Sequence, residues 1–130
     1  MKAYTDIEQS KKLAEILPLE SADMAWCNNS VKGVNYTDPF SANLYTVKEM
    51  QEAFDEALYG WEKHWKLIPC WSLAALLNVL PYPSLHKTWS GWRCDFHDKE
   101  GNVCMFGESA DNQIDACIDA IIKLHEQKLL

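Results

Sequence analysis

The spacing of hydrophobic residues changes along this chain, and the change restricts the fold more than any other feature of the sequence. Within residues 47–61 apolar side chains recur every three or four positions, which is the spacing of one helix face. Within residues 92–97 they alternate with polar ones, which is the spacing of a half-buried strand. Helical spacing returns after Ser109. This order predicts a small α+β fold of three to four helices packed on a C-terminal β-hairpin or small antiparallel sheet.

Local signals indicate where the helices begin and end. Thr5 caps the first helix, and Pro18 ends it because proline cannot continue a helix. A short helical turn is expected near Ser21–Trp26. The capping box of Thr46–Glu49 begins the second long helix. Residues 73–80 are apolar on nearly every side, which predicts a helix at the centre of the fold.

The strand over residues 92–97 is expected to form a hairpin with residues 103–106, because Gly101 suits the left-handed position of the connecting turn. The register that places residues 97 and 103 opposite each other sends four side chains to the buried face: Phe96 opposite Cys104, and Cys94 opposite Phe106. An isolated hairpin is only marginally stable, so helices are expected to cover that face. The last helix follows, capped by Ser109 or Asp111.

Length and charge restrict the domain organisation and the class of partner. A chain of 130 residues fits a single domain over residues 1–130. Its formal charge of -7 disfavours binding to duplex nucleic acid, where phosphate neutralisation supplies most of the affinity. The N-terminal residues lack the apolar core of a signal peptide, and no apolar stretch is long enough to span a membrane. We therefore expect a cytoplasmic protein that binds neither membranes nor duplex nucleic acid.

The positions of cysteine and histidine predict no metal and no other cofactor. The five cysteines contain no C-x-x-C pair, and the four histidines lack close ligand spacing. In a reducing compartment such cysteines are usually small buried hydrophobic residues. Asp111, Asp115 and Asp119 are spaced four residues apart, and we interpret them as the solvated side of a helix, because oxygen-ligand metal sites need carboxylates from more than one element.

One segment resembles a catalytic motif. Cys70-Trp71, next to an expected helix start, is similar to the Cys-Trp pair of papain-like cysteine proteases, in which the helix dipole helps to hold a thiolate. His97 would then be the base, and Glu108 or Asp111 would orient its imidazole. The glycine-containing context of that family is absent before Cys70, and only 27 residues separate Cys70 from His97. A buried structural Cys70 is therefore preferred, and a cysteine hydrolase is the alternative.

Six tryptophans are the most distinctive part of the composition. Trp26 and Trp71 adjoin apolar or helix-start segments, so we expect them in the core. The others lie beside polar and charged residues, as binding hot spots and stacking platforms do. They give a candidate binding surface of Trp61, Trp65, Trp89, Trp92 and Arg93.

Three segments of the chain carry a second resemblance. One is the run Ile68–Leu77, which leads to Leu80-Pro81. Another is the pattern Asn112-x-x-Asp115-Ala116-Cys117 with Ile121–Glu126, and the third is Ser21–Met24. These segments resemble a family of small uncharacterised proteins encoded by gut bacteria and their phages or mobile elements. The resemblance implies a lineage of phage or mobile-element type and supplies no activity.

These observations favour a non-catalytic cytoplasmic binding module that presents its tryptophans to a protein partner or a small ligand. Two alternatives stay open. One is the cysteine hydrolase with Cys70 as nucleophile and His97 as base. The other is a homo-oligomeric structural protein that buries the tryptophans between subunits.

Overall fold

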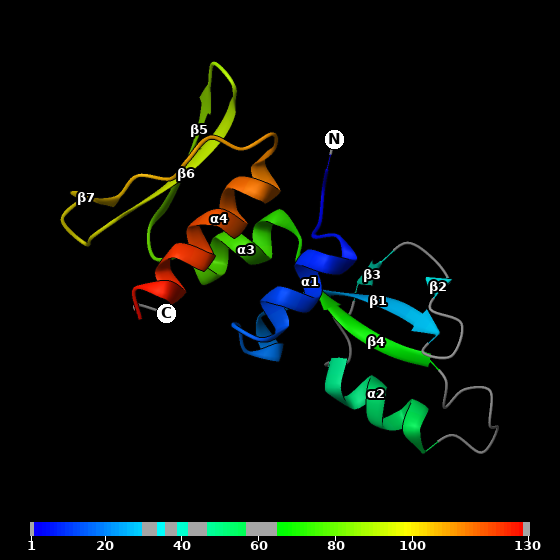
Figure 1. Cartoon of the computed structure of the whole chain (residues 1–130). Coiled ribbons are helices and arrows are strands. Elements are labelled where there is room, and N and C mark those ends of the chain that lie inside the picture. The colour runs from blue at the N-terminus through cyan, green and yellow to red at the C-terminus, as the bar shows by residue number, and fades with distance from the viewer. Residues whose placement is uncertain (1, 30–33, 36–38, 42–46, 57–64, 129–130) are drawn as a thin grey trace. The chain divides into compact units, whose positions relative to one another are not determined.

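The computed structural model describes residues 2–29, 34–35, 39–41, 47–56 and 65–128 of the chain. These residues form helices and two small antiparallel sheets, so the expected α+β class is confirmed (Figure 1). The chain divides into two compact units, one of Asp6–Trp71 and one of Met1–Thr5 with Ser72–Leu130. The single domain expected over residues 1–130 stays a prediction.

The unit of Asp6–Trp71 is built on the pairing of two strands, β1 and β4. They are antiparallel over their full length, from Met24 opposite Cys70 to Asn29 opposite Trp65. The short strands β2 and β3 pair with the two ends of β1, and the helices α1 and α2 contact β4. The elements of this unit are α1 (Ile7–Ala14), the 3-10 helix η1 (Leu19–Ser21), β1 (Met24–Asn29), β2 (Val34–Asn35), β3 (Phe40–Ser41), α2 (Val47–Asp55) and β4 (Trp65–Cys70).

The first helix begins one residue later than the sequence predicts. Asp6, not Thr5, is the N-cap, because its carboxylate accepts from the Gln9 backbone while the Gln9 side chain accepts from the Asp6 backbone. The helix ends at Ala14, before Pro18, which instead precedes η1.

The helical turn expected near Ser21–Trp26 lies earlier in the chain, as η1 over Leu19–Ser21, and β1 begins at Met24. In that strand Trp26 is half-buried. Trp71 is fully buried as expected, and its indole N–H donates to the Ser21 hydroxyl at 3.0 Å. The second long helix is confirmed as α2, while the proposed cap Thr46 lies outside the described residues.

The other unit contains a three-stranded sheet and two helices. The sheet has the order β5-β6-β7, with both pairs antiparallel, and α4 contacts both β6 and α3 (Figure 1). Its elements are α3 (Leu73–Val79), β5 (Pro83–Thr88), β6 (Gly91–His97), β7 (Val103–Met105) and α4 (Gln113–Glu126).

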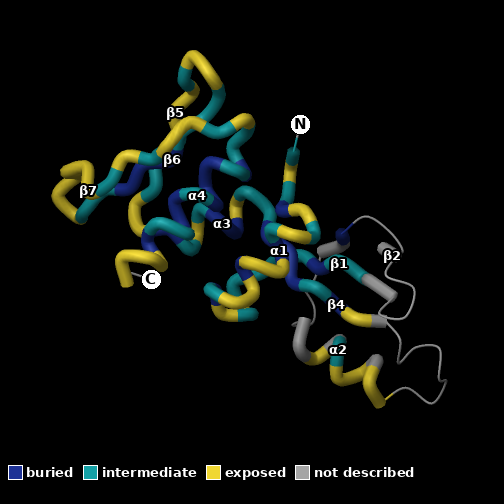
Figure 2. The backbone as a smooth tube through the Cα atoms, viewed as in Figure 1, coloured by how far each residue is buried: buried dark blue, intermediate teal, exposed yellow. Residues whose placement is uncertain are grey.

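The core of this unit lies along α4, which is dark on one side in Figure 2. Apolar residues three and four apart are buried along this helix, as the sequence predicts. They are Ile114, Ala116, Cys117, Ile118, Ala120, Ile121 and Leu124. The N-cap is Asn112, whose side chain accepts from the Asp115 backbone at 2.8 Å, so neither Ser109 nor Asp111 caps the helix. Ser72 caps α3 in the same way, through the Ala75 backbone.

Strand β5 is an element that the sequence did not indicate. Its connection to β6 is a two-residue turn, Trp89-Ser90, between the paired residues Thr88 and Gly91. Such turns usually carry Asn-Gly or Gly-Gly pairs. Here the glycine follows the turn and has a φ of 149°, so the usual signal is displaced by one position.

The expected pairing of β6 with β7 is confirmed at one end and wrong beyond it. His97 lies opposite Val103 as predicted, but a register irregularity between Phe96 and His97 places Phe96 opposite Met105. Cys104 is the extra residue between Val103 and Met105, and its side chain is exposed. Phe106 is exposed as well. Both were expected on the buried face.

Candidate functional site

The two faces of the β5–β6–β7 sheet differ in what covers them. Side chains alternate between the faces along a strand. Cys94 on β6 is buried beside Cys117 on α4, and α4 contacts β6, so the Cys94 side of the sheet faces that helix. We call the opposite side the outer face. Its residues on β5 and β6 are Ser84, His86, Thr88, Arg93, Asp95 and His97.

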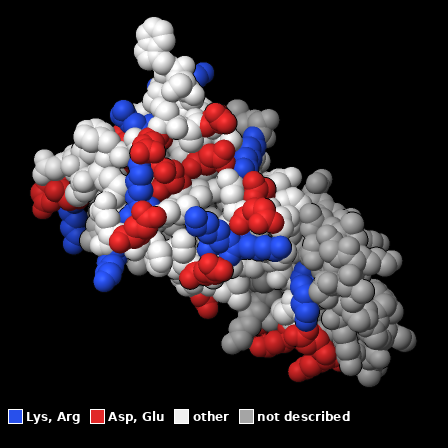
Figure 3. Space-filling view, viewed as in Figure 1, with Lys and Arg blue, Asp and Glu red and all other residues white. Residues whose placement is uncertain are grey.

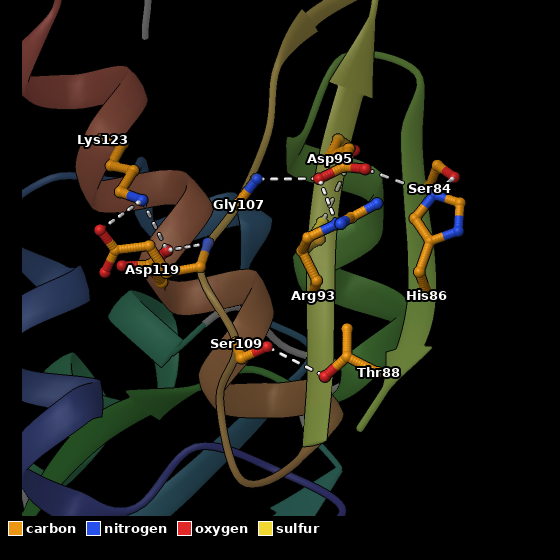
Figure 4. A network of polar contacts seen from close by, with 11 residues as sticks. Ser84, His86, Thr88, Arg93, Asp95, Gly107, Ser109, Asp119 and Lys123 are labelled. Atoms are coloured by element: carbon orange, nitrogen blue, oxygen red, sulfur yellow. Dashed lines mark hydrogen bonds and ion pairs between the residues drawn. The ribbon is translucent and has the colours of Figure 1, made fainter. Parts of the chain in front are cut away.

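A buried carboxylate, Asp95, is the centre of the outer face (Figure 4). Asp95 is 1% exposed. The Gly107 backbone N–H donates to its Oδ1 at 2.8 Å, and Arg93 Nε lies 3.1 Å from the same oxygen. His86 Nε2 is 3.4 Å from Oδ2. A buried carboxylate destabilises a fold unless its charge is compensated, so these contacts keep Asp95 in place.

The Arg93 side chain lies between Asp95 and an exposed aromatic ring. Its Nε is buried and is close enough to the Asp95 carboxylate to form an ion pair. The geometry of this contact is not that of a hydrogen bond. Its Cζ is 5.5 Å from the centre of the Phe106 ring, within the range of a cation–π interaction. The side chain as a whole is 35% exposed, and Phe106 is 64% exposed. The guanidinium is therefore fixed on one side and open to solvent on the other.

Ser84, His86 and Asp95 have the residue types of a hydrolytic triad but not its geometry. A triad needs the serine on one imidazole nitrogen and the carboxylate on the other. Here the Ser84 hydroxyl is 2.7 Å from His86 Nε2, and Asp95 is nearest to that same nitrogen. The proton relay of a triad is not available in this arrangement. What the cluster offers is a set of polar groups for binding.

Residues 107–110 run along β6 on the side opposite β5 and complete the outer face. Trp92 and Ala110 exchange two backbone hydrogen bonds of 2.7 Å. Closer to Asp95 the chain approaches β6 so tightly that a Cβ on Gly107 would lie 2.2 Å from the Cys94 carbonyl oxygen. Across Gly91, the Thr88 hydroxyl meets the Ser109 hydroxyl at 2.9 Å (Figure 4). Backbone contacts thus set the shape of this face.

Exposed apolar side chains surround the sheet. Trp89 is fully exposed in the turn between β5 and β6, and the uncharged end of this hairpin projects from the surface in Figure 3, with charged side chains beside and below it. Val103, opposite His97, shares the outer face and is also exposed. In the part of the chain that the structure describes, the exposed large apolar residues are Tyr82, Trp89, Val103 and Phe106, all in one unit.

The structure brings together three of the five residues of the candidate binding surface. Trp89, Trp92 and Arg93 lie on the β5–β6 hairpin, where Trp92 is half-buried on the face toward α4. Trp61 lies outside the described residues, and only the backbone of Trp65, at the start of β4, is described. Sequence reasoning missed His86 and Phe106, because a strand pairing and a register shift bring them to Arg93. It also missed Asp95, which lies two residues from Arg93 on β6, because the alternation along a strand does not show that a carboxylate is buried.

The residues of the alternative hydrolase lie in different units. Cys70 is the last residue of β4 and is fully buried, and it lies two residues before Ser72, the cap of α3. It is therefore not in the first turn of a helix, where the dipole would act on its thiol. His97 ends β6, and Glu108 is exposed with its carboxylate 3.6 Å from Lys123 Nζ. The hydrolase stays an untested prediction.

Two further thiols, Cys94 and Cys117, meet in the core between β6 and α4. The pKa of Cys117 lies well above its ordinary value, because its thiol is hydrogen-bonded to Cys94 and is buried. Cys117 therefore stays a neutral thiol and packs as a small hydrophobic group.

Among the residues with described positions, no three Cys, His, Asp or Glu side chains are grouped as metal ligands would be. Over the same residues, no helix combines the length and the apolar character needed to cross a membrane. The acidic side of α4 instead makes ion pairs. Asp115 is 3.0 Å from Lys2 Nζ, and Asp119 is 3.2 Å from Lys123 Nζ (Figure 4).

Comparison of the chain with protein-family models, with curated proteins and with solved structures found no match in any of the three.

Proposed function

We propose that this protein is a non-catalytic binding module whose β5–β6 hairpin engages a protein partner. The observation that carries the proposal is the full exposure of Trp89 at the hairpin tip. Tryptophan is strongly enriched at protein interfaces, and an indole left wholly in water forgoes the burial that stabilises it elsewhere. A partner that covers Trp89 would supply that burial.

The surroundings of Trp89 favour a binding surface over an isolated exposed residue. Phe106 and Val103 add exposed apolar area on the outer face, and Arg93 and His86 add hydrogen-bond donors beside it. Apolar anchors next to a few polar groups are typical of protein interfaces. Ser84 and Asp95 both approach the same nitrogen of His86, Nε2. This arrangement is not that of a hydrolytic triad, so it does not favour hydrolysis on this face.

The proposal is tested with the purified chain as bait in a soluble lysate of the organism that encodes it. Wild type, Trp89→Ala and Trp89→Phe are compared by quantitative mass spectrometry, with Glu126→Ala as a control at another exposed position of the same unit. A protein that is captured by wild type and by the control, but not by Trp89→Ala, is then purified and titrated. We expect Trp89→Ala to weaken its binding at least about tenfold, as for an interface hot spot.

Folding is checked separately, because a lost interaction must not reflect a lost structure. A fully exposed side chain contributes little to stability, so Trp89→Ala should change the free energy of unfolding by no more than about 0.5 kcal/mol. Unchanged binding in Trp89→Ala contradicts the proposal. Light scattering that shows a dimer in wild type and a monomer in Trp89→Ala would assign the surface to self-association instead.

A further inference from the structure

We infer that Arg93 is a carboxylate-binding position, and that the hairpin therefore takes an acidic peptide segment of its partner. This inference rests on the proposed function and specifies the chemistry that the outer face recognises. It is carried by the fixed guanidinium of Arg93, by its open end and by the local charge of the hairpin.

The first observation is that Arg93 is in contact with the protein on two sides. Asp95, buried and bound by the Gly107 backbone, fixes the Nε edge of the guanidinium. Phe106 lies 5.5 Å from Cζ and restricts the guanidinium plane from one side. A side chain restrained in this way loses little conformational entropy when it binds, so each further hydrogen bond adds more to affinity.

The second observation is that the other end of Arg93 has no partner among the residues that the structure describes. Within the part of the chain that the structure describes, the contacts of Arg93 involve its Nε and Cζ, and none involves its two terminal nitrogens. The terminal nitrogens of a guanidinium are spaced to donate two parallel hydrogen bonds to one carboxylate. His86, directly opposite Arg93 in the strand pairing and 45% exposed, adds a second possible donor.

The third observation is that the exposed charge of the hairpin is positive in an acidic protein. Residues 83–97 contain two cations, Lys87 and Arg93, and one carboxylate, Asp95, which is buried. The whole chain carries a formal charge of -7. Lys87 pairs with Trp92 and so lies on the face toward α4, which leaves Arg93 as the exposed cation that a carboxylate meets among the outer-face residues of β5 and β6.

The exposed apolar residues indicate that the carboxylate belongs to a peptide with apolar side chains. Phe106 lies beside Arg93, and Val103 lies on the same face near the end of β6. An extended peptide places side chains of alternate residues on one side, so an acidic residue on Arg93 can be accompanied by an apolar residue on Phe106. A polyanion such as duplex nucleic acid binds through many phosphates, so it does not fit a face where one arginine lies beside exposed apolar residues.

The test begins with a library of random linear peptides displayed on phage and selected on the folded chain. We expect the enriched peptides to share an Asp or Glu close to an aromatic or aliphatic residue. The most enriched peptide is then synthesised in two forms, acidic and with that residue replaced by its amide. Both forms are titrated by fluorescence anisotropy against wild type, Arg93→Lys and Trp89→Ala.

Arg93→Lys keeps the charge beside Asp95 but removes the paired donors, so folding is preserved while the bidentate contact is lost. We expect this substitution to weaken binding of the acidic peptide about tenfold, because a hydrogen bond to a charged group has that strength. Binding of the amide form should be unchanged. Lys99→Ala, which removes an exposed cation in the turn after β6, is the control and should change neither titration.

Three results would overturn the inference: no peptide enriched on wild type, enriched peptides without an acidic residue, or equal weakening of both forms by Arg93→Lys. These results are distinguishable from failure of the proposed function. If Trp89→Ala abolishes binding while Arg93→Lys does not, the hairpin is a binding surface and the carboxylate position is wrong. If the partner from the lysate binds Trp89→Ala as tightly as wild type, the proposed function itself fails.

Discussion

The two faces of strand β6 differ in what they bury, although their residues alternate along one short segment. Cys94 and Phe96 point toward α4 into an apolar core, where β6 and α4 are in contact. Arg93 and Asp95 point to the outer face, where a buried carboxylate is compensated by polar contacts beneath exposed apolar residues. The comparison indicates that the face toward α4 stabilises the fold, whereas the outer face is the one that we propose for binding.

The largest expected effect is the loss of an apolar side chain from the face toward α4. Phe96→Ala removes a ring that is 4% exposed and leaves a cavity, so we expect the free energy of unfolding to fall by about 3–5 kcal/mol. His97→Ala, one residue later and on the outer face, should lower it by no more than about 0.5 kcal/mol. Urea unfolding measures both. Equal losses would contradict the distinction between the two faces.

A glycine substitution tests whether backbone contacts shape the outer face. Gly107→Ala places a Cβ 2.2 Å from the Cys94 carbonyl oxygen and displaces the N–H that donates to Asp95. We expect a loss of about 3 kcal/mol in the free energy of unfolding and weaker peptide binding. Gly101→Ala is the matched control. Its φ of 86° is unfavourable for alanine, but its Cβ would meet nothing within 4 Å, so about 1 kcal/mol is expected.

Thiol labelling compares the faces without any mutation. Cys104 on β7 is exposed, whereas Cys94 and Cys117 lie between β6 and α4, and Cys117 has a raised pKa. At neutral pH we expect an alkylating agent to modify Cys104 at least about tenfold faster than the two buried thiols, which react only after local opening. Mass spectrometry of peptides from timed samples measures the rates.

The same labelling experiment tests the alternative hydrolase. Cys70 is buried, and we expect it to react as slowly as Cys94 and Cys117. A nucleophile activated by His97 would instead react faster than the exposed Cys104.

The smallest effect concerns the turn that joins β6 to β7. Backbone N–H groups of Asn102 and Glu100 donate to the Asp98 carboxylate and lower its pKa. A carboxylate with a lowered pKa in the folded state stabilises the fold above its ordinary pKa of about 3.9, and this contribution is lost as the pH falls through the lower folded value. Asp98→Asn should remove this part of the acid sensitivity, which unfolding midpoints measured between about pH 6 and about pH 3 can show.

Much of the fold could be predicted because it depends on residues close together in sequence. The helices α2, α3 and α4 and the strand β6 follow from hydrophobic spacing, and the turn at Gly101 was placed correctly. Helix caps were misplaced by one to three residues, since several neighbouring polar residues can each accept the first backbone N–H groups. Asp6 acts in place of Thr5, and Asn112 acts in place of Ser109 or Asp111.

The candidate site was only partly predictable. Trp89 and Arg93 were identified because tryptophan and arginine are typical of binding surfaces. His86 was not, because it reaches Arg93 only through the pairing of β5 with β6, and β5 follows no clear alternation. Phe106 was assigned to the wrong face because a single register irregularity reverses the direction of every later side chain.

The sequence by itself determined the α+β class, the acidic charge and the helical spacing of the apolar residues along α4, since each depends on composition or on local period. Only the tertiary structure decided that Asp95 is buried under Arg93 and that Trp89 is fully exposed. Burial and exposure depend on which strands pair and in which register. Those pairings join residues distant along the chain, and no local pattern specifies them.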